Sequence, residues 1–109
     1  MANTFKNEVF SGANTTASTD MAVYTAPTST TTVVIGLTLA NISTSQITVD
    51  VKLNAGTMVF LAKGIPIPVG SSFEYMAGNK IVLEAGHSLI VKSATANSLD
   101  TVASIMEIT

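Results

Sequence analysis

The sequence lacks several residue types on which common protein functions depend. Its 109 residues include no cysteine, no tryptophan and one histidine, His87. Without cysteine, neither a disulfide framework nor a thiolate metal site can form. One histidine cannot build a histidine-clustered zinc or iron site within a chain. We therefore expect no metal and no other cofactor.

Arginine is absent as well, and the five basic residues are lysines scattered singly along the chain. Arginine is the side chain that most often recognises guanine bases and forms bidentate hydrogen bonds with phosphate. The scattered lysines also form no visible basic patch. We expect no nucleic-acid partner. The start, Met1–Lys6, lacks the apolar core of a signal peptide. No apolar run approaches the roughly 20 residues of a membrane span, so we expect synthesis in a cytoplasm and no membrane partner.

Charge is scarce, whereas apolar residues are abundant. Charged residues make up 11% of the chain and hydrophobic residues 47%, against a globular norm of about 25% charged. Charge keeps surfaces apart, so a monomer with this surface is poorly guarded against self-association. The composition favours a surface that is covered in an assembly. A neutral, hydroxyl-coated monomer is the alternative.

The residues that could perform catalysis do not form a recognisable motif. His87 lies in Glu84–Ser88, which is typical of a turn between strands. Serines and aspartates could formally complete a Ser-His-Asp triad, but no nucleophile elbow accompanies them. The seven acids lack a calcium-loop spacing, and the glycines lack a phosphate-cradling run. We predict that the protein is not an enzyme.

Apolar residues recur with a period of two, which is typical of half-buried strands. The clearest runs are residues 32–39 and 47–53, rich in β-branched residues. Asn41–Ser45 separates them and has the length of a hairpin loop, so the pattern predicts that these two strands pair.

Weaker strands surround this pair. They are expected at residues 5–10, 21–25, 57–62, 71–76, 80–84, 88–93 and 101–108. Gly78-Asn79 suits a type II′ hairpin turn between residues 71–76 and 80–84, and Ala85-Gly86 suits another turn. Eight or nine short strands at about ten-residue spacing predict an all-β fold, an antiparallel, jelly-roll-like β-sandwich. We assign residues 20–109 to this domain and residues 1–19 to an N-terminal arm and linker.

Three apolar groups are candidates for contact with a partner. The first is on the arm, which could close the domain's own sheet or reach an adjacent subunit. The second is the segment Ile65–Gly70, whose prolines predict an extended edge or crossover segment, or else a plain loop with buried aliphatics. The third is an aromatic pair on one strand face, for which core packing is the default interpretation and contact with a partner the alternative. The candidate interface residues are Phe5, Val9, Phe10, Ile65, Pro66, Ile67, Pro68, Phe73 and Tyr75.

Four stretches of the chain are similar to those of small tailed-bacteriophage virion proteins. These stretches are Thr30–Asn41, Ile65–Ser72, Lys80–Leu89 and Ala96–Asp100. The resemblance extends over most of the chain from about Val23 to Ile108. It is carried by a patterned succession of strands and turns. An acidic residue is common in that group at the position of His87.

The resemblance implies a β-sandwich or jelly-roll protein of the virion that forms homotrimers. We expect a capsid decoration (cement) protein that packs against itself and against the major capsid protein or other virion proteins. A neck, collar or tail accessory protein is the alternative within the virion. A host-surface carbohydrate-binding module is a further alternative. Such modules normally bind sugars through exposed aromatic residues or metal-bound acidic residues, and the absence of tryptophan counts against this alternative.

Overall fold

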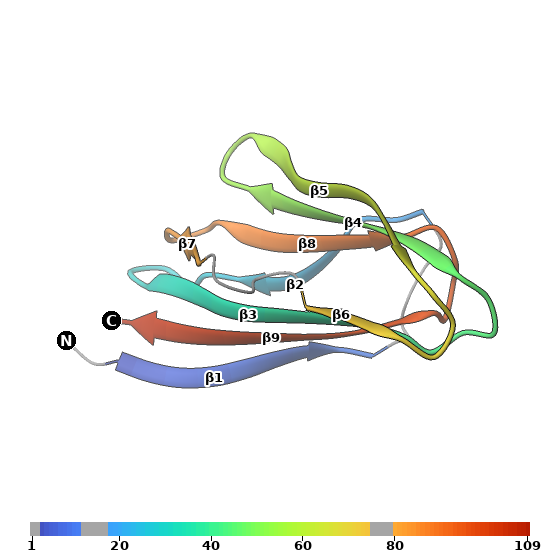
Figure 1. Ribbon diagram of the computed structural model, residues 1–109. Helices are drawn as coiled ribbons and strands as arrows, with labels where there is room; N and C mark the ends of the chain where they lie inside the picture. Colours follow the sequence, from blue (N-terminus) through green and yellow to red (C-terminus); the bar gives the residue numbers. More distant parts are fainter. Residues whose placement is uncertain (1–2, 12–17, 75–79) are drawn as a thin grey trace.

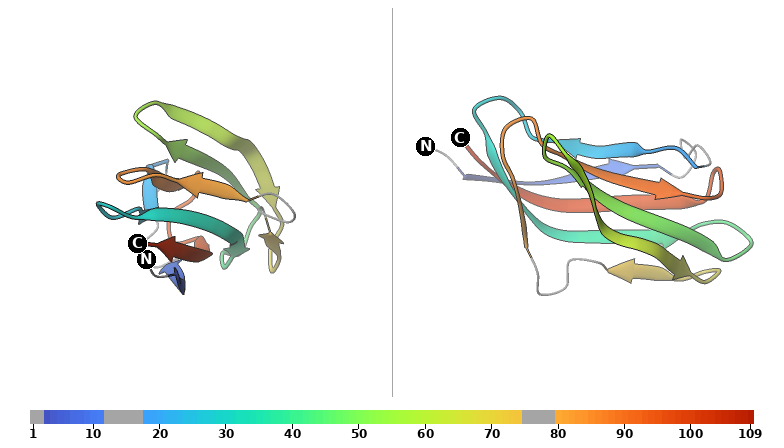
Figure 2. Two further views of the ribbon diagram at one scale, coloured as in Figure 1. Left: turned by 90° about the vertical axis from the view of Figure 1, so that its left-hand side faces the viewer. Right: turned by 90° about the horizontal axis from the view of Figure 1, so that it is seen from above.

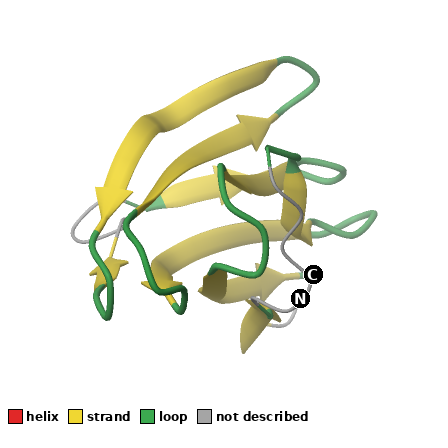
Figure 3. Ribbon diagram, turned by 90° about the vertical axis from the view of Figure 1, so that its right-hand side faces the viewer, coloured by secondary structure: helices red, strands yellow, loops and turns green. Residues whose placement is uncertain are grey.

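The computed structural model of the chain describes residues 3–11, 18–74 and 80–109. These residues form strands joined by loops and turns and contain no helix (Figure 3). No helix that could cross a membrane is therefore found in the described part of the chain. The strands are β1 (Asn3–Phe10), β2 (Met21–Thr25), β3 (Thr31–Asn41), β4 (Ile47–Asn54), β5 (Met58–Ile67), β6 (Ser72–Glu74), β7 (Ile81–Leu83), β8 (Ser88–Ser93) and β9 (Leu99–Ile108).

The strands form two antiparallel sheets that pack face to face (Figure 1). The first, which we call sheet A, has the order β1-β9-β3-β6, and β7 also pairs with β3. The second, sheet B, has the order β2-β8-β4-β5. In Figure 1, β1 runs along the lower border of the molecule and β5 along the upper border. The residues predicted near the N-terminus as a strand form β1, which pairs with β9 from end to end.

The chain crosses between the two sheets at most of its connections. It alternates A-B-A-B over β1 to β4, stays in sheet B for β5, and returns to sheet A for β6 and β7. It then crosses to β8 in sheet B and ends with β9 in sheet A. This order places strands that are distant in sequence side by side, as in the double Greek key of a jelly roll. The predicted fold class, an antiparallel and jelly-roll-like β-sandwich, is confirmed.

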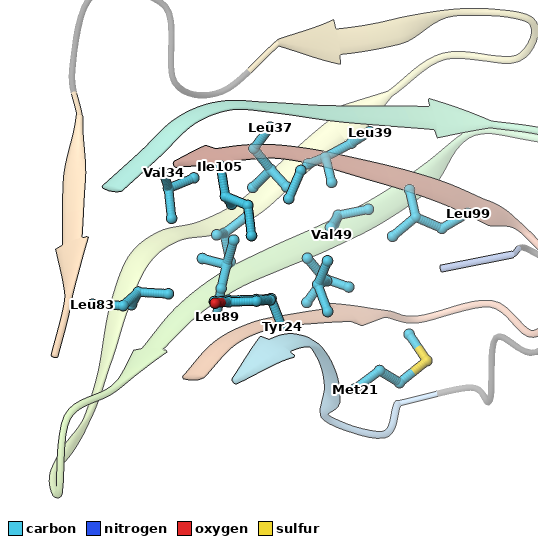
Figure 4. Packing of buried hydrophobic residues seen from close by; sticks show 14 of the residues in the cluster. Met21, Tyr24, Val34, Leu37, Leu39, Val49, Leu83, Leu89, Leu99 and Ile105 are labelled. Carbon is cyan, nitrogen blue, oxygen red and sulfur yellow. The ribbon is translucent and has the colours of Figure 1, made fainter. Parts of the chain in front are cut away.

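The core lies between the two sheets and consists of aliphatic side chains from their inner faces (Figure 4). This core arises because buried apolar residues alternate with exposed residues along the strands. On β4, Ile47, Val49 and Val51 are at most 1% exposed, whereas Thr48 between them faces solvent. On β3 of sheet A, Leu37 and Leu39 are likewise buried, and the less buried Thr38 lies between them. Burial of these apolar faces provides the main driving force for folding.

The predicted pairing of residues 32–39 with 47–53 is wrong, although both runs are strands. They form β3 and β4, which lie in different sheets, and residues 42–46 cross between the sheets. The Asn41 side chain holds this loop in place. Its buried side chain donates from Nδ2 to the carbonyls of Ser45 and Ile67, both at 2.9 Å. Its Oδ1 accepts hydrogen bonds from Ser43 N and Ser43 Oγ. A polar loop of this length therefore suits a crossover as well as a hairpin.

The predicted hairpin around Gly78-Asn79 is wrong as well, as far as the described residues reach. β6 and β7 do not pair with each other. Each pairs antiparallel with a different part of β3, β6 with residues 38–40 and β7 with residues 32–34. The two short strands thus lie end to end along one edge of sheet A. Residues 75–79, which include the predicted turn, lie outside the described residues.

The proline-containing segment Ile65–Gly70 is both an edge and a crossover, as predicted. Its first part belongs to β5, the border strand of sheet B, where Pro66 lies opposite Thr48. Proline lacks an N–H and is tolerated on an edge. Ile67 is buried in the core, whereas Val69, in the connection to β6, is 51% exposed. The alternative of a plain loop does not hold for residues 65–67.

Candidate protein interface

A row of apolar side chains crosses the outer face of sheet A, the face turned away from the core. Directly opposed residues of an antiparallel pair point to the same side of the sheet. The strand registers therefore place one side chain from each of four strands in line. The row runs through Phe5, Met106, Val33 and Val82. Its two ends are open to solvent, since Phe5 is 73% exposed and Val82 55%.

A second row lies beside the first toward the other end of the sheet. In it, Val9 is opposite Val102, and both are exposed. The row continues through Thr38 to Glu74 on β6. Together with Asp100, Glu74 supplies the charge on the outward positions of these strands, and no lysine occupies them. A connected apolar stripe on an exposed sheet face is typical of a protein interface.

The Glu74 carboxylate is tied to its own sheet. Its Oε1 accepts a hydrogen bond from the Leu37 amide at 2.9 Å, and its Oε2 accepts one from Thr38 Oγ1 at 2.6 Å. Gly36 permits this approach, because a Cβ at that position would lie 3.3 Å from Glu74 Oε1. The carboxylate therefore occupies a kink in β3, where the register with β9 shifts between Val34 and Gly36.

The outer face of sheet B is different, because it carries lysines, two of which have contacts within the chain. The Lys52 ammonium lies 2.8 Å from Asp20 Oδ1 and 4.9 Å from the centre of the Phe60 ring. The Lys63 ammonium lies 5.1 Å from the centre of the same ring. Cations placed over an aromatic face are attracted to it and shield it. Phe60, which is 49% exposed, thus has two of the chain's own lysines close to its ring.

The structure separates the residues that the sequence suggested as an interface. Phe5 and Val9 point outward from β1 and belong to the two rows. Phe10 points to the opposite side and packs against the core. Phe73 is 39% exposed on β6, opposite Leu39. Tyr75 lies outside the described residues.

The proline segment lies on a different part of the molecule. Pro66 and Pro68 are exposed at the border of sheet B, Ile65 is half-buried against the core, and Ile67 is 1% exposed. The views in Figure 2 place β5 and β1 on opposite borders of the sandwich. The candidates therefore do not form one surface.

Sequence reasoning missed Met106, Val33, Val82 and Val102 as surface residues. A signal for them exists in the sequence. Val33-Val34 and Ile105-Met106 are adjacent apolar pairs within strands. Because neighbouring residues of a strand point to opposite faces, each pair makes both faces apolar. Such pairs identify strands whose outer face is not adapted to water.

A buried hydrogen-bonded group links the two sheets at one end of the core. The Tyr24 hydroxyl donates to Glu107 Oε2 at 2.5 Å and lies 2.9 Å from Thr32 Oγ1. Burial, reinforced by the hydrogen bond to Glu107, raises the pKa of Tyr24 to about 12. The hydrogen bond from Tyr24, helped by Lys6 at 3.3 Å, lowers the pKa of Glu107. These contacts are typical of structural stabilisation between sheets.

His87 has a structural setting in the turn before β8. Its amide donates to the Glu84 carbonyl at 2.9 Å, and its Nδ1 accepts from the Glu84 amide at 3.3 Å. Within residues 3–11, 18–74 and 80–109, no group of three or more His, Asp or Glu side chains could hold a metal ion. The hollows beside β1 are open and shallow. One, of about 260 Å³, is lined by Val9, Phe10, Ser11, Asp100, Thr101 and Val102.

Comparison with solved structures relates this fold to phage capsids. The whole chain aligns with 89% of a chain from the acidic stable capsid structure of Helicobacter pylori bacteriophage KHP30, with a TM-score of 0.57 and 12% identity. This likeness shows a shared fold. Two crystal structures of a pentameric capsid protein isolated from metagenomic phage sequences align with 95% of the chain at TM-scores of 0.40 and identities of 17% and 18%. The alignments cover 60% and 59% of those chains.

No family model matches the sequence, and neither does any curated protein.

Proposed function

We propose that this chain is a non-enzymatic structural protein of a bacteriophage virion. The observation that supports this most strongly is the apolar outer face of sheet A. Its stripe from Phe5 to Val82 has no lysine on the outward positions of the strands that form it, and exposed apolar surface of this kind favours burial against another protein. The fold shared with a chain of the KHP30 capsid structure supports a capsid environment for that surface.

Within the virion, a capsid decoration protein is the role that we propose. Such a protein needs surface complementarity and apolar burial and needs no catalytic group. The small sandwich, with its border strand β1 and its apolar outer face, offers both. We further propose that it binds the shell as a homotrimer, in which the outer face of sheet A packs against a sister subunit or the major capsid protein. A neck, collar or tail position is the alternative within this proposal.

The proposal is tested by locating the protein in purified virions of the phage that encodes it. Density-purified particles are analysed by mass spectrometry for peptides of this chain, and the protein is labelled with immunogold. We expect the protein to remain with the particles and the gold to be distributed over the shell. Gold confined to the portal end would replace decoration with the neck or tail role. Recovery of the protein in the soluble part of the lysate would contradict a virion role altogether.

A further inference from the structure

We propose that two copies of this chain join their β1 strands side by side, antiparallel and centred on Asn7, so that their two A sheets become one continuous sheet. The occupant of the β1 edge is thus a second copy of the same chain. This inference rests on the proposed function, packing against other protein chains, and adds a named contact to it. Main-chain hydrogen bonds of this kind are a common mode of protein association.

The first support is the long, regular and unpaired edge that β1 presents. β1 pairs with β9 residue for residue from Asn3 to Phe10 without a register shift. None of the other described strands pairs with its second side. It contains neither proline nor glycine. An edge of this length without proline, bulge or glycine is a template for pairing with another chain, provided that its charged side chains, Lys6 and Glu8, find partners there.

The other sheet borders are protected in ways that β1 is not. β5 contains Pro66 and a shift in its register with β4 near Gly64, whose φ is +69°. β2 has five residues and a bulge between Ala22 and Tyr24. β6 and β7 have three residues each. Proline, bulges and short strands are three of the means by which proteins block unwanted edge pairing. β1 is the described border that lacks them.

The second support is charge complementarity, which selects one register. An antiparallel pair centred on Asn7 places Lys6 opposite Glu8 of the partner subunit, and the two-fold symmetry repeats this pair. A shift of two residues either way would instead oppose two Lys6 or two Glu8 side chains. A shift of one residue would turn the outer face of one copy toward the inner face of the other. Opposite charges on directly opposed residues stabilise a strand pair, and like charges destabilise it.

The third support comes from the outer face. In the same register, Phe5 lies opposite Val9 of the partner subunit, and Val9 lies opposite the partner's Phe5. Phe5 and Val9 are 73% and 67% exposed in the single chain. Pairing would give each an apolar neighbour on its free side. The row through Phe5 would then continue into the row through Val9 and Val102 of the second copy. The same register thus pairs opposite charges on one face of β1 and apolar side chains on the other.

The symmetry of this contact is two-fold, because the same patch is used by both partners. It cannot by itself close a trimer. If the chain also forms the homotrimer proposed above, the β1 contact joins two trimers rather than two subunits of one trimer. The purified protein is then expected to have a mass of two or six chains.

A disulfide cross-link at the symmetry axis tests the contact and its register. Opposed Cα atoms in an antiparallel pair are about 4.5–5.5 Å apart, within the range that a disulfide bridges. The chain has no cysteine of its own, so Asn7→Cys gives a single thiol per chain. Under mild oxidation we expect its covalent dimer to form at least about tenfold faster than that of Asn3→Cys, because paired strands hold the two thiols at high effective concentration. Asn3 is the matched control, since it is exposed on the same face of β1 but would lie opposite residue 11.

Charge variants at the same position provide the second arm. Asn7→Asp and Asn7→Lys each place two like charges at the axis, so each variant is expected to sediment at half the mass of the wild type. An equimolar mixture should recover the full mass, because the pair is then Asp opposite Lys. Asn3→Asp and Asn3→Lys serve as controls and should leave the mass unchanged.

Equal cross-linking at positions 3 and 7 overturns the proposal, as does a mass that neither charge variant at Asn7 changes. Both measurements use the purified full chain without virions. Their failure is therefore distinct from a failure to find the protein on the particle.

Discussion

The outer faces of the two sheets differ in charge, although both expose apolar side chains, among them Phe5 and Val82 on sheet A and Met58 and Phe60 on sheet B. Sheet B presents Lys52, Lys63 and Lys92, and its exposed Phe60 lies under two of these ammonium groups. Sheet A presents exposed aliphatic and aromatic side chains, and no lysine lies on its outward strand positions. Both faces cover the same core, so folding requires neither of them to be apolar. We infer that the difference reflects what each face contacts outside the chain.

The two faces also differ in whether their exposed groups have partners within the chain. On sheet B, Lys52 pairs with Asp20, and Lys52 and Lys63 both lie over the Phe60 ring. On sheet A the apolar groups at the ends of the stripe, Phe5 and Val82, are more than half exposed. A surface whose charges are internally paired is suited to water, whereas unsatisfied apolar surface is suited to a protein partner. We infer that sheet B faces solvent and that sheet A docks.

Introducing one charge on each face is the strongest way to break this comparison. We expect Val82→Asp to reduce binding to the virion by more than about 100-fold, about 3 kcal/mol, because a buried unpaired carboxylate is costly to desolvate. Thr48→Asp on sheet B is the matched control and should bind as the wild type does. Occupancy is measured by adding each purified variant to particles that lack the protein. Equal loss in both variants would show that the two faces do not differ in this respect.

Removing the Tyr24 hydroxyl tests the core that both faces share. We expect Tyr24→Phe to lower the free energy of unfolding by about 2 kcal/mol at neutral pH, because Glu107 loses a short hydrogen bond in a mostly buried site. Neither outer face changes, so binding to the virion should be retained wherever the variant is folded. Denaturant unfolding followed by circular dichroism gives the stability. A loss of binding by the folded variant would contradict the separation of core and docking face.

The pH dependence of this variant sharpens the test on both sides of neutrality. The pKa of Tyr24 is raised to about 12 from an ordinary 10, so the associated stability is present below pH 10 and is lost between about pH 10 and 12. The pKa of Glu107 is lowered. Its contribution is therefore present above the carboxyl's unfolded pKa and is lost as the pH falls through the folded value. Tyr24→Phe should flatten both the alkaline and the acid decline.

The strands of this fold were readable from the sequence, whereas their partners were not. The alternation in residues 47–53 arises from burial of one face, which is a local consequence of a strand lying on a core. The crossover of residues 42–46 includes a contact between distant parts of the chain, since the Asn41 side chain reaches the carbonyl of Ile67 on β5. No periodicity encodes a contact 26 residues away. For that reason the jelly-roll-like class was predictable and the strand pairing was not.

The docking face was predictable only in part for a related reason. Phe5 and Val9 were recognisable because they stand in a mostly polar N-terminal stretch. Met106 and Val82 lie among other apolar residues, and their outward direction follows from strand register. The register brings β1, β9, β3 and β7 into one row, and this alignment is a property of the folded sheet.

The smallest expected effect concerns the charge pair that adapts sheet B to water. Asp20→Asn removes the partner of Lys52, whose side chain is 10% exposed, while the Asp20 side chain itself is 41% exposed. Solvent screening limits the value of such a pair, and Lys52 keeps its position over Phe60. We therefore expect a loss of no more than about 1 kcal/mol in the free energy of unfolding, measured by urea denaturation at low salt, and a smaller loss at high salt. Binding to the virion should not change. A reduction in binding comparable to that of Val82→Asp would mean that sheet B also takes part in docking, and the contrast between the two faces would then lose its functional meaning.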